Sequence, residues 1–330
     1  MLRYVNTDEP GLRRRRCGGG FVYIDTDGKA VADPEIRRRL AALAVPPAWT
    51  DVWLCRDSKG HIQATGRDQR GRKQYVYHPE WREQREQTKY AQLGAFAEAL
   101  PAIRRRVDAD LATGAPDERG VLAAAVRLLD LTGIRVGNTS YFEENGTVGL
   151  TTLQDRHAEI VGSRIVLRFK AKSGRQVDTS VASRRVARLL LRCEELEGQR
   201  LFRYRSGDDV CELDSIKLNS YLREIAGADV TAKHFRTWIG TVTVVERWLE
   251  RGAPLTIKEA AASAAKRLEN TQAVTRRSYI HPGILAIATA RAPTAHERAG
   301  ARRARAQLSG AEALCARLLA AALVDMREAS

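Results

Sequence analysis

The stretch Arg164-Ile-Val-Leu-Arg-Phe-Lys-Ala-Lys172-Ser-Gly174-Arg-Gln-Val-Asp-Thr179 decides the fold class of this chain. β-Branched and aromatic residues fill segments 164–170 and 175–179, and Lys172-Ser-Gly174 between them is typical of a tight turn. The pattern predicts an antiparallel hairpin with Lys172 at its tip. Segments 147–153 and 159–161 have a similar strand-like composition, so we expect a small sheet at this point of the chain.

Helical periodicity surrounds this island of strands. Apolar residues recur at intervals of three and four, with capping residues or glycine at the ends of several segments. The predicted helices are Glu80 to Leu100, Glu118 to Thr132 with Gly133 as the stop, Ala182 to Leu196, Leu213 to Ala226, Lys233 to Glu250, Ile257 to Leu268 and Gly310 to Met326.

The first part of the chain is strand-rich by contrast. Predicted strands lie within Gly19 to Gly28, Trp49 to Cys55, His61 to Thr65 and Lys73 to Tyr77. One helix, from Pro34 to Leu43, follows Asp33 as its N-cap and is stopped by Pro46-Pro47. We therefore predict an α+β fold with a small strand-rich domain at 1–85 and a larger, mainly helical domain at 86–330 that carries a small antiparallel sheet.

Composition indicates a folded protein with a polyanionic partner. The 330 residues are 44% hydrophobic and 29% charged, which excludes wholesale disorder, and the net charge is +15 with a pI near 10.0. Such a charge favours nucleic acid as the partner, although it does not by itself indicate catalysis. The run Arg13 to Arg16 could be a nuclear address or a phosphate contact, but a solvated run of charge is the favoured interpretation.

Cysteine usage and hydropathy predict the compartment. The five cysteines are far apart and form no Cys-x-x-Cys pair, which indicates a reducing environment and no zinc site. Segment 1–10 lacks the apolar core of a signal peptide, and the apolar run Leu318 to Val324 is too short to span a bilayer. We expect a soluble cytoplasmic protein without membrane contact. No P-loop and no clear carboxylate cluster is evident, so neither a nucleotide cofactor nor a metal is expected.

A set of separated residues could transfer a phosphoryl group. Tyr279 would be the nucleophile, and Arg135 and Arg236 would bind the non-bridging phosphate oxygens with their planar guanidinium groups. Lys172 would protonate the departing oxygen, and Asn270 would add a neutral donor. Each residue also has an ordinary explanation, because tyrosines usually pack at core edges, and arginine, lysine and asparagine often decorate surfaces, turns and caps.

The order of these residues resembles that of type IB DNA topoisomerases, in particular the compact poxvirus and bacterial branch. Four motifs of the second half carry the resemblance: Ile134-Arg135-Val-Gly137, Arg168-Phe-Lys-Ala-Lys172-Ser-Gly174, Lys233-His-Phe-Arg236-Thr-Trp238 and Ser278-Tyr279-Ile-His-Pro282. In the first half, Thr65-Gly-Arg-Asp-Gln-Arg-Gly-Arg-Lys-Gln74-Tyr75-Val-Tyr77-His resembles the strand with which the family's small domain contacts DNA. The resemblance covers most of the chain.

The resemblance implies a two-domain clamp that encircles double-stranded DNA as a monomer and relaxes supercoils in the nucleoid. It implies a 3′-phosphotyrosyl bond at Tyr279, the roles given above for Arg135, Lys172, Arg236 and Asn270, and a helper role for Lys233. It also implies DNA contacts for Arg67, Gln74, Tyr75 and Tyr77. One departure stands out, because poxvirus and eukaryotic relatives have histidine where this chain has Asn270.

Two other functions fit parts of the same pattern. A tyrosine recombinase would use the same nucleophile, but it usually has histidine where this chain has Lys233. A noncatalytic architectural protein would need only the basic charge. Tyr75 and Tyr77 should project to the same side of their strand, where packing in a small core competes with DNA contact as their role.

Overall fold

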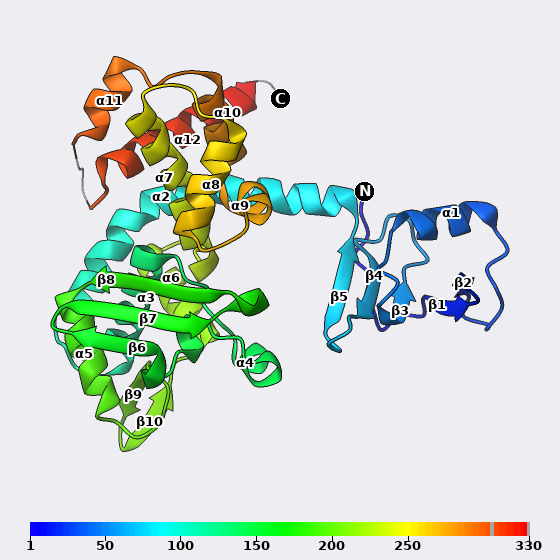
Figure 1. Cartoon of the computed structure of the whole chain (residues 1–330), viewed down its shortest axis with the longest axis horizontal. Helices are drawn as coiled ribbons and strands as arrows, with labels where there is room; N and C mark the ends of the chain where they lie inside the picture. Colours follow the sequence, from blue (N-terminus) through cyan, green and yellow to red (C-terminus); the bar gives the residue numbers. More distant parts are fainter. Residues whose placement is uncertain (304–306, 329–330) are drawn as a thin grey trace. The chain divides into compact units, whose positions relative to one another are not determined.

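The computed structural model describes residues 1–303 and 307–328 of the chain (Figure 1). It divides into two compact units, Met1–Lys89 and Tyr90–Ser330. The division lies inside helix α2 (Pro79–Asp110), and the sequence-based boundary after residue 85 falls in the same helix.

The first unit is an antiparallel sheet with one helix. Its strands run in the spatial order β2-β1-β3-β4-β5, so β5 is an edge strand. Leu40 of the helix joins Leu12, Val52, Leu54 and Ala64 of the strands in a small core. The elements are β1 (Leu12–Cys17), β2 (Gly20–Ile24), α1 (Pro34–Ala42), β3 (Thr50–Leu54), β4 (Ile62–Arg67) and β5 (Lys73–Tyr77).

The arginine run forms strand β1, so its interpretation as solvated charge is wrong for one of its members. Arg14 donates from Nη1 to the Val45 carbonyl at 2.6 Å and from Nη2 to the Trp49 carbonyl at 2.9 Å. Its guanidinium also lies 4.1 Å from the Phe21 ring centroid. The aliphatic part of the arginine side chain can cover apolar surface, while its guanidinium group holds the segment that follows α1 through hydrogen bonds. The other three arginines of the run are exposed.

The second unit combines helices with a small sheet, so the predicted α+β class is confirmed. Its helices are α3 (Glu118–Thr132), α4 (Thr139–Asn145), α5 (Arg184–Glu194), α6 (Ser215–Ala226), α7 (Ala232–Arg251), α8 (Ile257–Arg267), α9 (Gln272–Tyr279), α10 (Pro282–Ala290), α11 (Ala295–Ala301) and α12 (Gly310–Glu328). The strands β6 (Ala158–Val161), β7 (Arg164–Lys170) and β8 (Gln176–Ala182) form one antiparallel sheet, and β9 (Arg203–Ser206) pairs with β10 (Asp209–Glu212).

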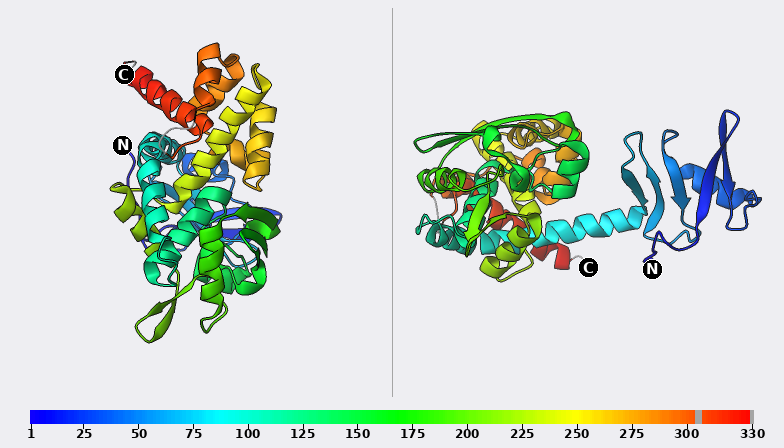
Figure 2. Two further views of the ribbon diagram at one scale, coloured as in Figure 1. Left: turned by 90° about the vertical axis from the view of Figure 1, so that its left-hand side faces the viewer. Right: turned by 90° about the horizontal axis from the view of Figure 1, so that it is seen from below.

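Two groups of elements build this unit around a common core. The sheet β6-β7-β8 packs against α3 and α5, whereas α7 packs against α8, α9, α10 and α12 at the other end of the unit (Figures 1 and 2). Phe96, Phe235 and Trp238 are among the large side chains buried in the core. Helix α7 therefore contributes side chains to the core and also contacts α9.

Several predicted elements are confirmed closely. Helix α3 has the predicted bounds, and Gly133 ends it in the left-handed conformation at φ 65°. Strands β5 and β7 also match, and Lys172–Gly174 forms a turn between β7 and β8. Helices α7 and α8 begin and end within one residue of the predictions.

Two predicted elements are wrong. Segment 147–153 is not a strand, because the N–H groups of Leu150 and Thr151 bond to the carbonyls of Arg135 and Val136, and residues Leu150–Thr152 form a 3₁₀ turn. Helix α2 does not end at Leu100. The apolar spacing continues through Ile103 and Val107, and the burial of these residues keeps the helix intact past Pro101.

The short elements α4, α9, α10, α11, β1, β9 and β10 were not predicted. In the arginine- and alanine-rich segment 297–306, which includes most of α11, Glu297 is buried and accepts from Arg291 at 2.7 and 2.8 Å. Residues 304–306 of that segment lie outside the described part of the chain.

Candidate active site

Tyr279 is the last residue of α9, and its backbone is held against α7. The Thr271 hydroxyl caps α9 by accepting the Val274 N–H at 3.2 Å. At the other end, the Thr241 hydroxyl lies 3.5 Å from the Tyr279 carbonyl oxygen and accepts the His281 N–H at 3.0 Å. A Cβ on Gly240 would collide with the Tyr279 carbonyl oxygen. Glycine at position 240 is therefore required for this close approach.

The guanidinium of Arg236 lies beside the ring of Tyr279. Its Cζ is 4.9 Å from the ring centroid, and the arginine is 5% exposed. Nη1 donates to the Gly133 carbonyl and Nη2 to the Leu268 carbonyl, the latter at 3.1 Å. Arg236 therefore joins the end of α3 to the loop that follows α8. Nε is buried and has no acceptor among the described residues.

Electrostatics in the site make the phenol of Tyr279 easier to ionise. Burial raises the pKa of Tyr279, but the charges of Arg236, Arg135 and Lys233 outweigh it and bring the pKa below its usual value of about 10. Two effects lower the pKa of Arg236 to about 10: burial is the larger one, and repulsion by Arg135 is the second. The guanidinium is still charged at neutral pH. The arrangement lowers the cost of forming a phenolate and supplies cations for a phosphate.

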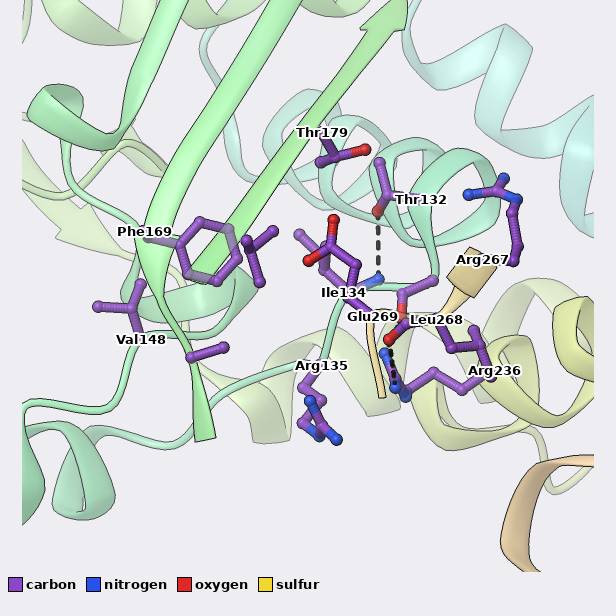
Figure 3. A pocket seen from close by; sticks show the side chains of 13 residues that line it. Thr132, Ile134, Arg135, Val148, Phe169, Thr179, Arg236, Arg267, Leu268 and Glu269 are labelled. Atoms are coloured by element: carbon purple, nitrogen blue, oxygen red, sulfur yellow. Dashed lines mark hydrogen bonds between the residues drawn. The ribbon is translucent and has the colours of Figure 1, made fainter. Parts of the chain in front are cut away.

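Arg135 is positioned by glycines and backbone hydrogen bonds. It follows the left-handed Gly133, and its carbonyl accepts the Leu150 N–H at 2.8 Å. Gly137 and Gly149 pack backbone against backbone, an approach that a side chain at Gly149 would prevent. Figure 3 shows the Arg135 and Arg236 side chains at one side of a small cavity.

Sequence reasoning missed Glu269, which lines that cavity. The cavity measures about 20 Å³, room for one water molecule, and has walls from α3, β7, β8, α7 and the end of α8. Glu269 has a left-handed backbone with φ 48°, uncommon for a residue other than glycine, and burial raises the pKa of its carboxyl. Its Oε2 is buried with no partner among the described residues. Nothing in the sequence pattern singles this residue out beyond its position before Asn270.

The remaining predicted site residues border the same region. Lys233 is exposed on the first turn of α7, where the helix dipole disfavours a cation, and its charge acts on Tyr279. The Asn270 Oδ1 accepts the Thr271 N–H at 2.9 Å, whereas its Nδ2 is buried and without an acceptor in the described structure. Lys172 is exposed on the hairpin turn, directly after the cavity-lining Ala171.

The predicted DNA-contacting residues lie on the β4–β5 hairpin of the first unit. The rings of Tyr75 and Tyr77 stack with centroids 5.9 Å apart and planes inclined by 13°, which confirms that they project to the same side. Tyr75 is 41% exposed, so core packing does not explain it, and Tyr77 is half-buried. Arg67 donates to the Gly71 carbonyl at 2.8 Å, and the Gln74 amide bonds to Asp68.

The described residues include no group of three or more histidine, cysteine or acidic side chains placed to hold a metal ion. Within the same residues, every helix is too short or too polar to cross a bilayer.

Two family models match the chain, one in its N-terminal part and one over most of the rest. The model for the catalytic core of eukaryotic DNA topoisomerase I matches residues 78–286, and the model for the N-terminal domain of bacterial DNA topoisomerase IB matches residues 20–68. The chain belongs to the type IB DNA topoisomerase family.

Named viral proteins are similar to it. The DNA topoisomerase 1B of Acanthamoeba polyphaga mimivirus is 29% identical over 285 residues, which cover 82% of this chain and 85% of the viral protein. The DNA topoisomerase 1B of Vaccinia virus (strain Western Reserve) is 29% identical over 107 residues, covering 32% of this chain and 34% of the viral protein.

Proposed function

We propose that this chain relaxes supercoiled DNA by reversible transesterification at Tyr279. The observation that carries the proposal is the tyrosine ring held 4.9 Å from a buried guanidinium, with a pKa lowered by three cationic side chains. A phenol in this setting loses its proton at lower cost, and the same cations stabilise the charge of a pentacoordinate phosphorane.

The reaction exchanges one phosphodiester for another. The Tyr279 oxygen bonds to phosphorus as the bond to the 5′-oxygen breaks, which leaves a 3′-phosphotyrosyl link and a 5′-hydroxyl. Arg135, Arg236 and Asn270 bind the non-bridging oxygens, Lys172 protonates the leaving oxygen, and Lys233 assists near the phosphate. The broken strand rotates, and the 5′-hydroxyl then attacks the phosphotyrosyl link and reverses the cleavage. Each step exchanges one phosphodiester for another, so no nucleotide is consumed.

The substrate is duplex DNA. The exposed arginines of the first unit and the β4–β5 hairpin with Arg67, Gln74, Tyr75 and Tyr77 supply phosphate and base contacts. In this proposal a single copy acts as a monomer, encloses the duplex between its two domains and works on the nucleoid in the cytoplasm.

The test is plasmid relaxation with and without EDTA, in the absence of ATP. We expect full relaxation in both buffers, because no step uses a metal or a nucleotide. Tyr279→Phe should bind DNA and form no covalent adduct, and peptide mapping of the wild-type adduct should identify Tyr279. A strict need for magnesium contradicts the proposed chemistry, and an adduct at another residue contradicts the site. DNA binding without any adduct would favour the architectural alternative.

A further inference from the structure

Arg104 joins three helices through a buried ion network. It lies on the part of α2 that continues past Leu100, and its Nε and Nη2 donate to the two carboxylate oxygens of Asp130 on α3, both at 2.8 Å. Its Nη1 and Nη2 donate to the two oxygens of Glu312 on α12, at 2.9 and 2.7 Å. The three side chains are only 14%, 7% and 12% exposed. Nη1 also donates to the Gln307 carbonyl, so every N–H group of the guanidinium has an acceptor.

Glu312 connects this network to α7. Its Oε1 accepts the Nε1–H of Trp238 at 3.1 Å, and Trp238 is 1% exposed. Its Oε2 accepts the backbone N–H of Ser309 at 2.7 Å, directly before α12. Burial raises the pKa of Glu312, but the hydrogen bonds and the charge of Arg104 outweigh it and bring the pKa below its usual value. The carboxylate is therefore ionised at neutral pH and holds the start of α12 against α2 and α7.

Two links join α3 to α7. In the first, Nη1 of Arg236 on α7 donates to the carbonyl of Gly133, which ends α3. In the second, Asp130, one turn before Gly133, is connected through the ion network to Trp238, which lies within one turn of Arg236 on α7. A shift of α3 against α7 would carry the Arg236 guanidinium away from the Tyr279 ring, because that guanidinium is bonded to the end of α3.

We propose that Arg104 and Glu312 are positioning residues, which hold α3 against α7 and so keep the Arg236 guanidinium beside Tyr279. This inference rests on the proposed function. Stability alone is a weak explanation of the network, because the desolvation of buried charges offsets much of their attraction, and well-packed apolar side chains often stabilise a core as well or better. A bidentate pair between a guanidinium and a carboxylate fixes direction as well as distance, which the placement of a phosphate-binding group requires.

The test compares single-turnover cleavage of a duplex by the wild-type protein, Glu312→Gln and Arg104→Lys. Glu312→Gln leaves Arg104 paired with Asp130, so no charge loses its partner, but an amide nitrogen replaces one of the oxygens that face the guanidinium. Arg104→Lys keeps the charge, and its single ammonium group cannot bind both carboxylates in bidentate geometry. In each variant we expect the cleavage rate constant to fall roughly 10- to 100-fold, as a displacement of about 1 Å can cause. Filter binding should show nearly unchanged DNA affinity.

The pH dependence of cleavage separates positioning from stability. Against the effect of burial, the charge of Arg236 is the largest influence that lowers the pKa of Tyr279. Displacing the guanidinium should therefore raise that pKa and move the rising limb of the pH–rate profile to higher pH in both variants. A variant that is only less stable would show fewer active molecules, with the wild-type rate constant and pH profile. Thermal melting followed by circular dichroism sets an assay temperature below every unfolding transition.

Arg291→Lys is the matched control, because Arg291 also makes a bidentate pair, with the two oxygens of Glu297 at 2.8 and 2.7 Å. That pair connects the residue after α10 to α11 and does not belong to the network around Arg104. We expect this variant to keep the wild-type rate constant and pH profile.

A wild-type rate constant in either folded variant, Glu312→Gln or Arg104→Lys, overturns the inference. A slower rate without a shift of the pH profile does the same, because it would mean that the charge of Arg236 has not moved from Tyr279. An equal loss of rate in Arg291→Lys also contradicts it. If Glu312→Gln does not fold, Arg104→Lys decides. A wild-type protein that forms no adduct at Tyr279 refutes the proposed function instead, so the two failures are distinguishable.

Discussion

At the scale of single residues, the site concentrates positive charge around one phenol. Arg135, Arg236 and Lys233 come from separate parts of the chain, and together they lower the pKa of Tyr279 against the effect of its burial. Resemblance to a family of known chemistry predicted these residues. Their electrostatic coupling depends on distances and burial, which single-residue patterns do not contain.

Glu269 shows what the sequence leaves out. Its left-handed φ of 48° and its unpartnered Oε2 are properties of the folded loop. Strain of this kind costs on the order of 1–3 kcal/mol and is common near functional sites.

We expect Glu269→Gly to stabilise the protein. Glycine adopts positive φ without a Cβ penalty, and the change also removes a carboxyl oxygen, Oε2, that is buried without a partner among the described residues, so the gain in unfolding free energy should be about 1 kcal/mol. Urea titration followed by circular dichroism measures it. Glu269→Ala is the matched comparison, because it removes the same carboxylate but keeps a Cβ at positive φ. Equal stability of the two variants would show that the backbone is not strained.

At the scale of elements, long segments with regular periodicity were predictable and short ones were not. Helix α3 has a clear apolar face and a glycine stop, and its predicted bounds are confirmed. Helix α9 has only eight residues, most of them polar. It is stabilised by packing on α7 rather than by its intrinsic helix propensity. The strand prediction for segment 147–153 was wrong for a related reason, since its backbone bonds to the loop that contains Arg135 and Val136.

The contact between α7 and α9 yields a prediction at this scale. Gly240→Ala would normally stabilise a helix by up to about 1 kcal/mol. Here the added methyl group must displace the Tyr279 carbonyl, so we expect adduct formation to slow by roughly 10²-fold, as a displacement of about 1 Å can cause. Single-turnover cleavage of a duplex measures the rate, and filter binding should show nearly unchanged affinity.

Gly19→Ala is the control, because a Cβ at that glycine meets open space. Wild-type cleavage rates in Gly240→Ala would mean that the close approach does not set the position of Tyr279.

At the scale of the whole molecule, we expect the excess charge of +15 to govern DNA binding. Part of the basic content is neutralised internally, for example where Arg104 pairs with Asp130 and Glu312 at 2.8 and 2.7 Å. The excess remains for phosphates, and composition alone predicted this property because net charge requires no knowledge of the fold.

Binding should therefore be strongly salt-dependent. For the Tyr279→Phe protein, which should not cleave DNA under the proposed function, we expect affinity for duplex DNA to fall roughly 10³-fold or more between 50 and 200 mM salt, as for proteins with six or more phosphate contacts. Fluorescence anisotropy at several salt concentrations measures the slope. Arg67→Ala should make the slope shallower by about one. A salt-independent affinity would be incompatible with binding through phosphates.

The two backbone carbonyls that Arg236 engages have a further consequence. The Arg236 side chain joins the end of α3 to the loop after α8, and in the proposed function it also binds the reacting phosphate. Lysine could keep the positive charge, but its single ammonium group cannot reproduce the planar fork that spans both oxygens. Position 236 therefore has two constraints. A substitution to lysine would remove a contact between the end of α3 and the loop after α8, and under the proposed function it would also weaken phosphate binding.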